Sequence, residues 1–198
     1  TGGIIGGTHK MKDLTITADN ASIGADLYGS GTLTIQPLTT SRIMKVAYNT
    51  ENGTTLHLDT NEVNRIKDGW SSILLGRSDA ISGGMVDVGT TTWNDPVTFR
   101  GYALRVYGNV TNQGDSSFTA TSASGVRAEI NGSAASVTTQ NQALTFSNGY
   151  TFYGTGTTSI SSNGGSITIG GPIRGDTAAI GTHTINSGGG NISIGNGT

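Results

Sequence analysis

The chain has 198 residues, enough for one domain or for one long stack of repeats. Its net charge is −2 at neutral pH without any basic run, which argues against nucleic acid as a partner. Cysteine is absent, so disulfides, thiolate zinc sites and cysteine nucleophiles are excluded, and no apolar run approaches the ~20 residues that span a bilayer.

Short runs that alternate apolar and polar residues recur along the whole chain, as half-buried strands do. The chain has 32 glycines and only 12% charged residues, a composition that favours many short strands and tight turns. Turn signals such as Asn52-Gly53 and Asn148-Gly149 separate the runs. The expected strands are 13–17, 32–36, 55–58, 72–75, 85–88, 97–100, 104–110, 117–121, 126–130, 143–147, 150–154, 158–161, 166–170, 182–186 and 191–195.

One segment, residues 58–70, breaks the strand pattern. Val63 and Ile66 lie three residues apart, as on one face of a helix, and Asp59 or Thr60 could cap its start. We expect a helix of two turns or fewer within 59–67, ended by Gly69. Such a helix is too short to form a layer and would cover a corner of the sheet.

Two stretches near the end of the chain repeat each other. "GTTSISSNGGSITIG" (156–170) returns as "GTHTINSGGGNISIG" (181–195), 25 residues later. A coil of that length can place two or three short strands around a closed circuit, and stacked coils pair strand on strand. The predicted interior pairs are Ile160 on Ile185, Ile167 on Ile192 and Ile169 on Ile194, whereas outward Ser, Thr and Asn need only be soluble.

These features predict an all-β fold, a right-handed parallel β-helix (β-solenoid) of roughly eight coils with one short helix. Residues 1–198 would form a single segment of a longer repeat protein or of a filament. The alternative is an antiparallel β-sandwich, whose turn signals should fall every 8–12 residues. The spacing within 143–154 also satisfies that pattern.

The segments "TLHLDTNEVNRIKDGWSSILLGRSD" (55–79) and "VDVGTTTWNDPVTFR" (86–100) resemble a known family, the repeat regions of giant secreted filamentous-haemagglutinin-like proteins of bacteria, notably of cyanobacteria. The later coils "SITIGGPI" and "NISIGNG" resemble that family's simple repeats. The resemblance implies a parallel β-helix, export to the cell surface or medium, and roles in adhesion, matrix or fibre building. The matching residues are Leu56, Leu58, Asp59, Glu62, Val63, Asp68, Gly69, Trp70, Ile73, Leu75, Gly76, Arg77, Asp95, Pro96, Val97 and Thr98.

The sequence offers little that points to catalysis. No phosphate loop, nucleophile elbow or zinc-binding helix is present, and His9, His57 and His183 lacks a partner at metal-ligand spacing in each case. Paired carboxylates could serve a β-helix polysaccharide lyase or hydrolase. The candidates, for which helix caps and turns are the simpler explanation in several cases, are Asp59, Glu62, Asp68, Asp79, Asp87 and Asp95.

We therefore expect no enzyme and no cofactor, but a structural or adhesive segment of a secreted or cell-surface fibre. The expected partners are copies of the chain itself, neighbouring repeats of a longer chain, or cell-surface glycans. An end-to-end contact would join Ile192 and Ile194 to Ile4 and Ile5 of another copy. Tyr150, Phe152 and Tyr153 either fill the core or form an aromatic contact patch. The alternative functions are a carbohydrate-binding or tailspike-like module and a polysaccharide lyase or hydrolase.

Overall fold

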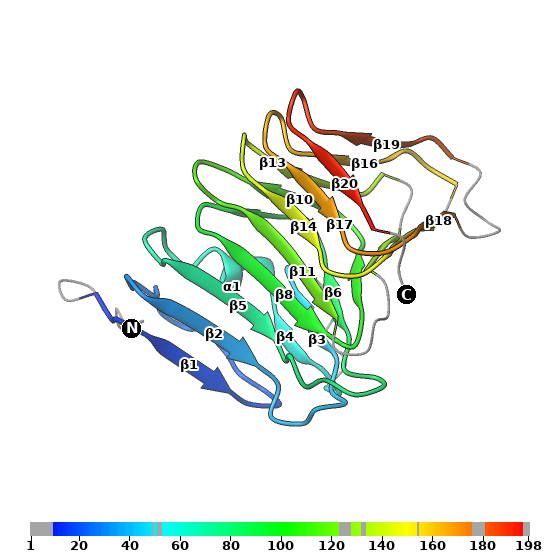
Figure 1. Ribbon diagram of the computed structural model, residues 1–198. Coiled ribbons are helices and arrows are strands. Elements are labelled where there is room, and N and C mark those ends of the chain that lie inside the picture. The colour runs from blue at the N-terminus through cyan, green and yellow to red at the C-terminus, as the bar shows by residue number, and fades with distance from the viewer. Residues whose placement is uncertain are drawn as a thin grey trace.

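The structure, a computed structural model, describes residues 10–48, 50, 53–122, 128–131, 134–153, 155–175 and 181–195. Their strands form three parallel sheets, which we call the first, second and third faces (Figure 1). The first face contains β1 (Leu14–Thr17), β2 (Thr32–Gln36), β5 (Ser72–Gly76), β8 (Val97–Gly101), β11 (Phe118–Ser122), β14 (Leu144–Phe146), β17 (Ile167–Ile169) and β20 (Ile192–Ile194). The second face contains β4 (Leu56–Leu58), β3 (Met44–Val46), β6 (Val86–Val88), β9 (Leu104–Val106), β12 (Ala128–Asn131), β15 (Tyr150–Tyr153) and β18 (Ile173–Gly175). The third face contains β7 (Thr91–Trp93), β10 (Asn109–Asn112), β13 (Ser136–Thr139), β16 (Thr158–Ser161) and β19 (His183–Asn186).

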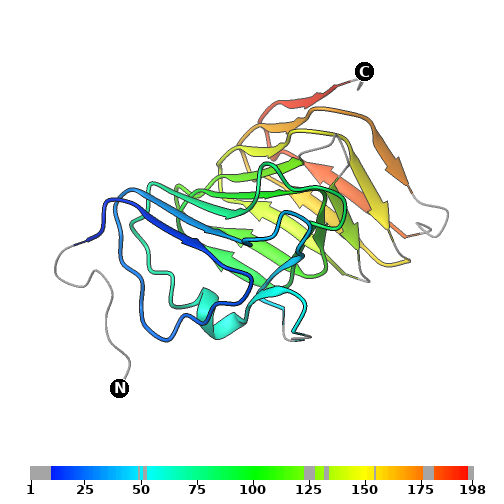
Figure 2. The same ribbon diagram turned by 90° about the horizontal axis from the view of Figure 1, so that it is seen from below.

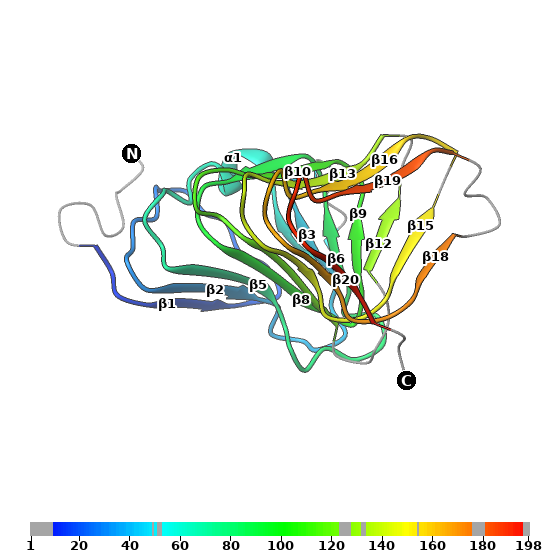
Figure 3. The same ribbon diagram turned by 45° about the horizontal axis from the view of Figure 1, so that its top comes forward.

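From β5 onward the chain visits the first, second and third faces in turn and then returns to the first. The three faces enclose a common interior, as the tilted view in Figure 3 shows. Every strand pairing within the described residues is parallel. The solenoid prediction is therefore confirmed, with about seven turns instead of roughly eight, and the antiparallel sandwich is wrong.

Alternation along each strand builds the interior. In β2 the side chains of Leu33 and Ile35 are buried while the three threonine and glutamine side chains between and beside them are not. Parallel pairing then stacks like on like, so Leu33 lies on Ile73 and Ile73 on Val97. The result is a continuous apolar column inside the first face, which buries apolar surface only between neighbouring turns.

Several strands were not expected from the sequence. β3, β7, β13 and β18 have only three or four residues each, too few to establish an alternating pattern. The run predicted as one strand over 104–110 is two strands, β9 and β10, because the chain turns a corner from the second face to the third between them.

One departure from the regular path occurs between β3 and β5. After β3 the chain folds back, so that β4 pairs on the side of β3 opposite β6. Helix α1 (Thr60–Val63) follows, and Figure 2 shows it beside the first turns of the stack. Its N-cap is Asp59, as expected, in a reciprocal capping box with Glu62. The helix ends at Val63, earlier than the predicted end near Gly69.

Glycine allows the bends to stack closely. A Cβ on Gly165 would lie 2.1 Å from the carbonyl oxygen of Gln142 in the preceding turn, and a Cβ on Gly190 would lie 2.1 Å from that of Gly165. Any side chain at these two positions would push the turns apart. The glycine-rich bends are thus required by the spacing between turns.

A row of small polar side chains lies inside the solenoid where the third face turns toward the first. Thr139, Ser162 and Ser187 are buried, and each hydroxyl donates a hydrogen bond to the carbonyl oxygen three residues later. Asn112 starts the row and donates to Ser117 O at 2.9 Å. The expectation that Ser, Thr and Asn face outward is wrong here, because these side chains satisfy carbonyls that the tight bend leaves without a partner.

Candidate functional site

The turn formed by β19 and β20 lies at one end of the described stack. Ile192 and Ile194 are 45% and 51% exposed, although they pair in register with the buried Ile167 and Ile169. Ile185 pairs with Ile160 and is partly buried against the core. The three predicted isoleucine pairs are therefore confirmed. The turn presents apolar side chains and a strand edge on its outer side, and we call this surface the end face.

The other predicted partners of the end face, Ile4 and Ile5, lie outside the described residues. β1 is the edge strand of the first face at the opposite end of the stack. Its inward residues Leu14 and Ile16 are partly buried and pack against the core. The described stack thus has a partly uncovered apolar row at each end.

The predicted aromatic contact patch does not lie on the surface as a unit. Tyr150 and Phe152 are buried, with ring centroids 4.5 Å apart, and Tyr153 is half-buried. Burial raises the pKa of Tyr150 well above its usual value, so the phenol stays neutral. Tyr150 and Phe152 fill the core, which leaves no exposed three-ring platform for a partner.

A groove opens in the third face between two neighbouring turns. Ile66, in the turn before β7, forms a bridge with Leu27, whereas β7 is the edge strand of the five-stranded sheet. The space between Ile66 and β7 is the groove, with a volume of about 510 Å³. The lining residues are Tyr28, Val63, Asn64, Ile66, Lys67, Asp68, Ile73, Thr92, Trp93, Asn94, Asp95 and Gln113.

Two carboxyl groups meet in this groove. Asp68 is exposed at the rim and Asp95 is buried beneath it, and the two are hydrogen-bonded. Asp95 also accepts a hydrogen bond from the backbone N–H of Gly69 at 3.0 Å. The pKa of Asp95 rises from 3.8 to about 6, first because of burial and then because of Asp68, while the N–H groups of Gly69 and Trp70 act in the opposite direction.

The sequence did not bring these two carboxylates together. Each has a local explanation in the sequence, a turn for Asp68 and the pair with Pro96 for Asp95. They meet because they are about one turn of the solenoid apart. The 25-residue echo near the end of the chain carried this signal, since residues one repeat apart lie side by side.

The other acidic candidates have structural partners. Asp59 and Glu62 form the capping box of α1. Asp79 pairs with Arg77, and Asp87 accepts two hydrogen bonds from Arg105 at 2.7 and 2.8 Å. These contacts account for the four carboxylates without a ligand.

Histidine chemistry is also accounted for where the structure describes it. The Nε2 atom of His57 contacts the backbone oxygen of Tyr48. His183 stacks on Phe152, and its Nδ1 lies 2.8 Å from the Thr158 hydroxyl. His9 lies outside the described residues. No group of three or more His, Cys, Asp or Glu side chains in the described part of the chain could hold a metal ion.

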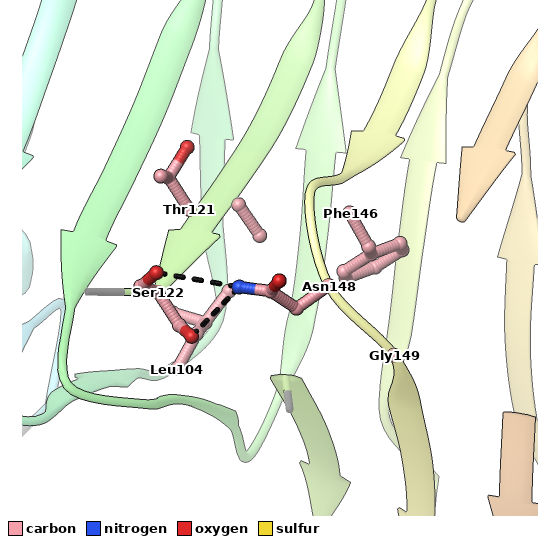
Figure 4. Close-up of a pocket in the computed structure, with 7 residues that line it drawn as sticks. Leu104, Thr121, Ser122, Phe146, Asn148 and Gly149 are labelled. Carbon is pink, nitrogen blue, oxygen red and sulfur yellow. Dashed lines mark hydrogen bonds between the residues drawn. The ribbon is translucent and has the colours of Figure 1, made fainter. Parts of the chain in front are cut away.

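A small cavity lies at the corner between the first and second faces (Figure 4). Asn148 crosses it, donating from Nδ2 to the backbone oxygen of Ser122 at 3.3 Å and to its hydroxyl at 2.9 Å. The cavity volume is about 10 Å³, room for one water at most. Asn148 ties two turns together here, and the corner is too small for an organic ligand.

The fold places the chain among the parallel β-solenoids. Comparison with protein-family models, with curated proteins and with solved structures finds no match to the sequence. Among the residues that the structure describes, there is no helix with the length and apolar character needed to cross a membrane.

Proposed function

We propose that the chain is a structural segment of a secreted or cell-surface fibre, without catalytic activity of its own. The observation that carries this proposal is the apolar column of the first face, which ends on the exposed Ile192 and Ile194. A further turn laid on β20 would bury both side chains and pair the free strand edge. The turn comes from another copy of the chain or from neighbouring repeats of a longer one.

Stacking of this kind is self-propagating. One end of a copy meets the opposite end of the next, so the contact is heterologous and forms an open filament unless the rotation closes. Exposed strand edges recruit further strands in the same way. Because the contact consists of backbone hydrogen bonds and apolar side chains, it resists salt better than a contact between surface charges.

The family resemblance of residues 55–79 and 86–100 supports the setting of the proposal. It favours a filamentous-haemagglutinin-like surface protein with a role in adhesion, matrix or fibre building. On this proposal the extracellular location and the contact with cell-surface glycans follow from the same resemblance.

Electron microscopy of the purified chain at increasing concentration tests the assembly. We expect rods that lengthen with concentration, and Ile194→Asp should abolish them while leaving the unfolding midpoint unchanged, since that side chain is half exposed. The control is Ser193→Asp, on the same strand but facing the other way, which should still form rods. Discrete monomers of the unmodified chain at high concentration would contradict self-assembly.

The absence of catalysis has a separate test. Neutral and acidic polysaccharides are incubated with the chain, and new reducing ends are measured. We expect none. Turnover that disappears when Asp59, Asp68 or Asp95 is replaced singly by Asn would show that the chain is a polysaccharide enzyme.

A further inference from the structure

The groove beside β7 exposes residues that elsewhere belong to the interior. Strand pairing closes the third face from β7 onward, but the segment at Ile66 stands apart from β7. Through this opening the buried side chains of Val63, Ile73 and Trp93 become the floor of the groove. A break in one wall of the solenoid has therefore produced a concave site.

The groove has a polar rim around this apolar floor. Five exposed side chains with hydrogen-bonding groups stand at the rim, two from the turn at Ile66 and three from the next two turns. They are Asn64, Asp68, Thr92, Asn94 and Gln113. The half-buried ring of Tyr28 closes one part of the lining. An apolar floor, a few convergent polar groups and a volume of about 510 Å³ are typical of small-molecule sites, which run from ~300 to ~1,000 Å³.

We infer that this groove binds a short oligosaccharide. Sugar hydroxyls both donate and accept hydrogen bonds; carboxylates such as Asp68 accept them, and the amides of Asn64, Asn94 and Gln113 do both. The C–H faces of sugar rings are apolar and pack on aromatic surfaces such as Trp93 and Tyr28. The rim and floor thus match the two kinds of surface that one sugar ring presents.

The acid pair favours binding over cleavage of such a ligand. Glycoside hydrolysis by two carboxyl groups needs them ~5 Å apart or more, so that the scissile bond fits between them. Asp68 and Asp95 are hydrogen-bonded to each other, which brings them closer than that. Asp95 is also held by the N–H of Gly69, so it stiffens the turn that presents Asp68.

The solenoid supplies a matched pair of variants for the test. Gln113 lines the groove, and Gln140 follows Thr139, which pairs with Asn112 one turn earlier. The two glutamines are therefore equivalent by register, and both are exposed. Asp68 is matched by Asp115, a second exposed aspartate that does not line the groove.

The full chain is applied to an array of neutral and acidic oligosaccharides in the presence of EDTA, and retained sugars are then titrated calorimetrically. We expect at least one class of oligosaccharide to bind. Gln113→Ala and Asp68→Asn should each weaken it by about tenfold or more, the effect of losing a hydrogen bond to a bound ligand. Gln140→Ala and Asp115→Asn should keep the original affinity, and all four variants should keep the original unfolding midpoint.

Three results would overturn the inference. No sugar on the array binds, or binding is the same in the groove variants as in their controls, or binding needs a divalent cation and is lost in EDTA. The assembly variant Ile194→Asp should bind sugar as the unmodified chain does. Failure of filament formation and failure of sugar binding are therefore distinguishable.

Discussion

At the bends of the solenoid, the presence or absence of one carbon atom sets the distance between turns. Replacement of Gly165 by Ala would place a Cβ 2.1 Å from the carbonyl oxygen of Gln142, which is backbone and cannot swing aside. We expect a loss of about 1–3 kcal/mol in the free energy of unfolding, the usual cost of overpacking. Chemical denaturation measures it.

Gly24 provides the control for this substitution. A Cβ at Gly24 meets nothing within 4 Å. Gly24→Ala should therefore leave stability unchanged or raise it slightly, because alanine reduces the freedom of the unfolded chain. Equal effects of the two substitutions would mean that the close approach at Gly165 is not what limits the spacing.

The buried carboxyl of Asp95 should make stability depend on pH in an unusual direction. Its pKa is about 6 in the folded chain and 3.8 in an ordinary carboxyl group, so the folded state holds the proton more tightly. The stabilisation from this proton is full below about pH 4 and is lost as the pH rises to about 6. Asp95→Asn, which stays neutral, should flatten this part of the profile.

Thermal unfolding of both proteins between pH 3.5 and 7.5 measures the effect. The difference in unfolding midpoint between Asp95→Asn and the unmodified chain should grow from pH 4 to pH 6 in favour of the variant. Asp115→Asn is the control, since that residue is exposed. A constant difference over the whole range would contradict a raised pKa.

At the scale of single strands, the two sides of β17 should respond in opposite ways to a charge. Ile169 is fully buried between Phe146 and Ile194, so Ile169→Asp would bury an unpaired carboxylate. We expect a loss of at least about 3 kcal/mol, at the upper end for single substitutions. Thr168→Asp on the exposed side should change stability little, and an unchanged unfolding midpoint for Ile169→Asp would contradict the interior column.

The outer side of the second face carries its own register marks. Lys45, Asp87, Arg105 and Glu129 follow one another on adjacent strands, with alternating charge. Arg105 and Asp87 form the closest pair, with Nε 2.7 Å from the carboxylate. A shift of one residue would move these groups inside, so the row opposes misalignment of strands.

The sequence predicted the first face better than the rest of the molecule, for physical reasons. Strands such as β2 and β17 alternate cleanly because one side is buried and the other is solvated. β7 could not be recognised, since Thr91, Thr92 and Trp93 are too few to show a period. The meeting of Asp68 and Asp95 could not be derived because turns differ in length: Val97 pairs with Phe118, 21 residues later, and Phe118 with Leu144, 26 residues later.

For the molecule as a whole, stability should be a sum over neighbouring turns. Each turn of a solenoid contacts only the turns before and after it. Removal of residues 181–198 should therefore leave a folded protein with a lower unfolding midpoint, because Ile160, Ile167 and Ile169 lose their cover. Circular dichroism measures the remaining strand content. Complete unfolding of the shortened chain would mean that the turns act as one unit.

The direction of the strands has a mechanical consequence. All pairings are parallel and run from turn to turn, so the hydrogen bonds between strands point along the rod and not across it. A pull along the rod loads the bonds of the outermost turn one after another, as when a zip is opened. Each turn that peels away releases a length of chain set by its repeat. For the 25 residues between Ile167 and Ile192 this is roughly 85 Å of extended polypeptide, so a stretched fibre would lengthen in steps while its remaining turns stay stacked.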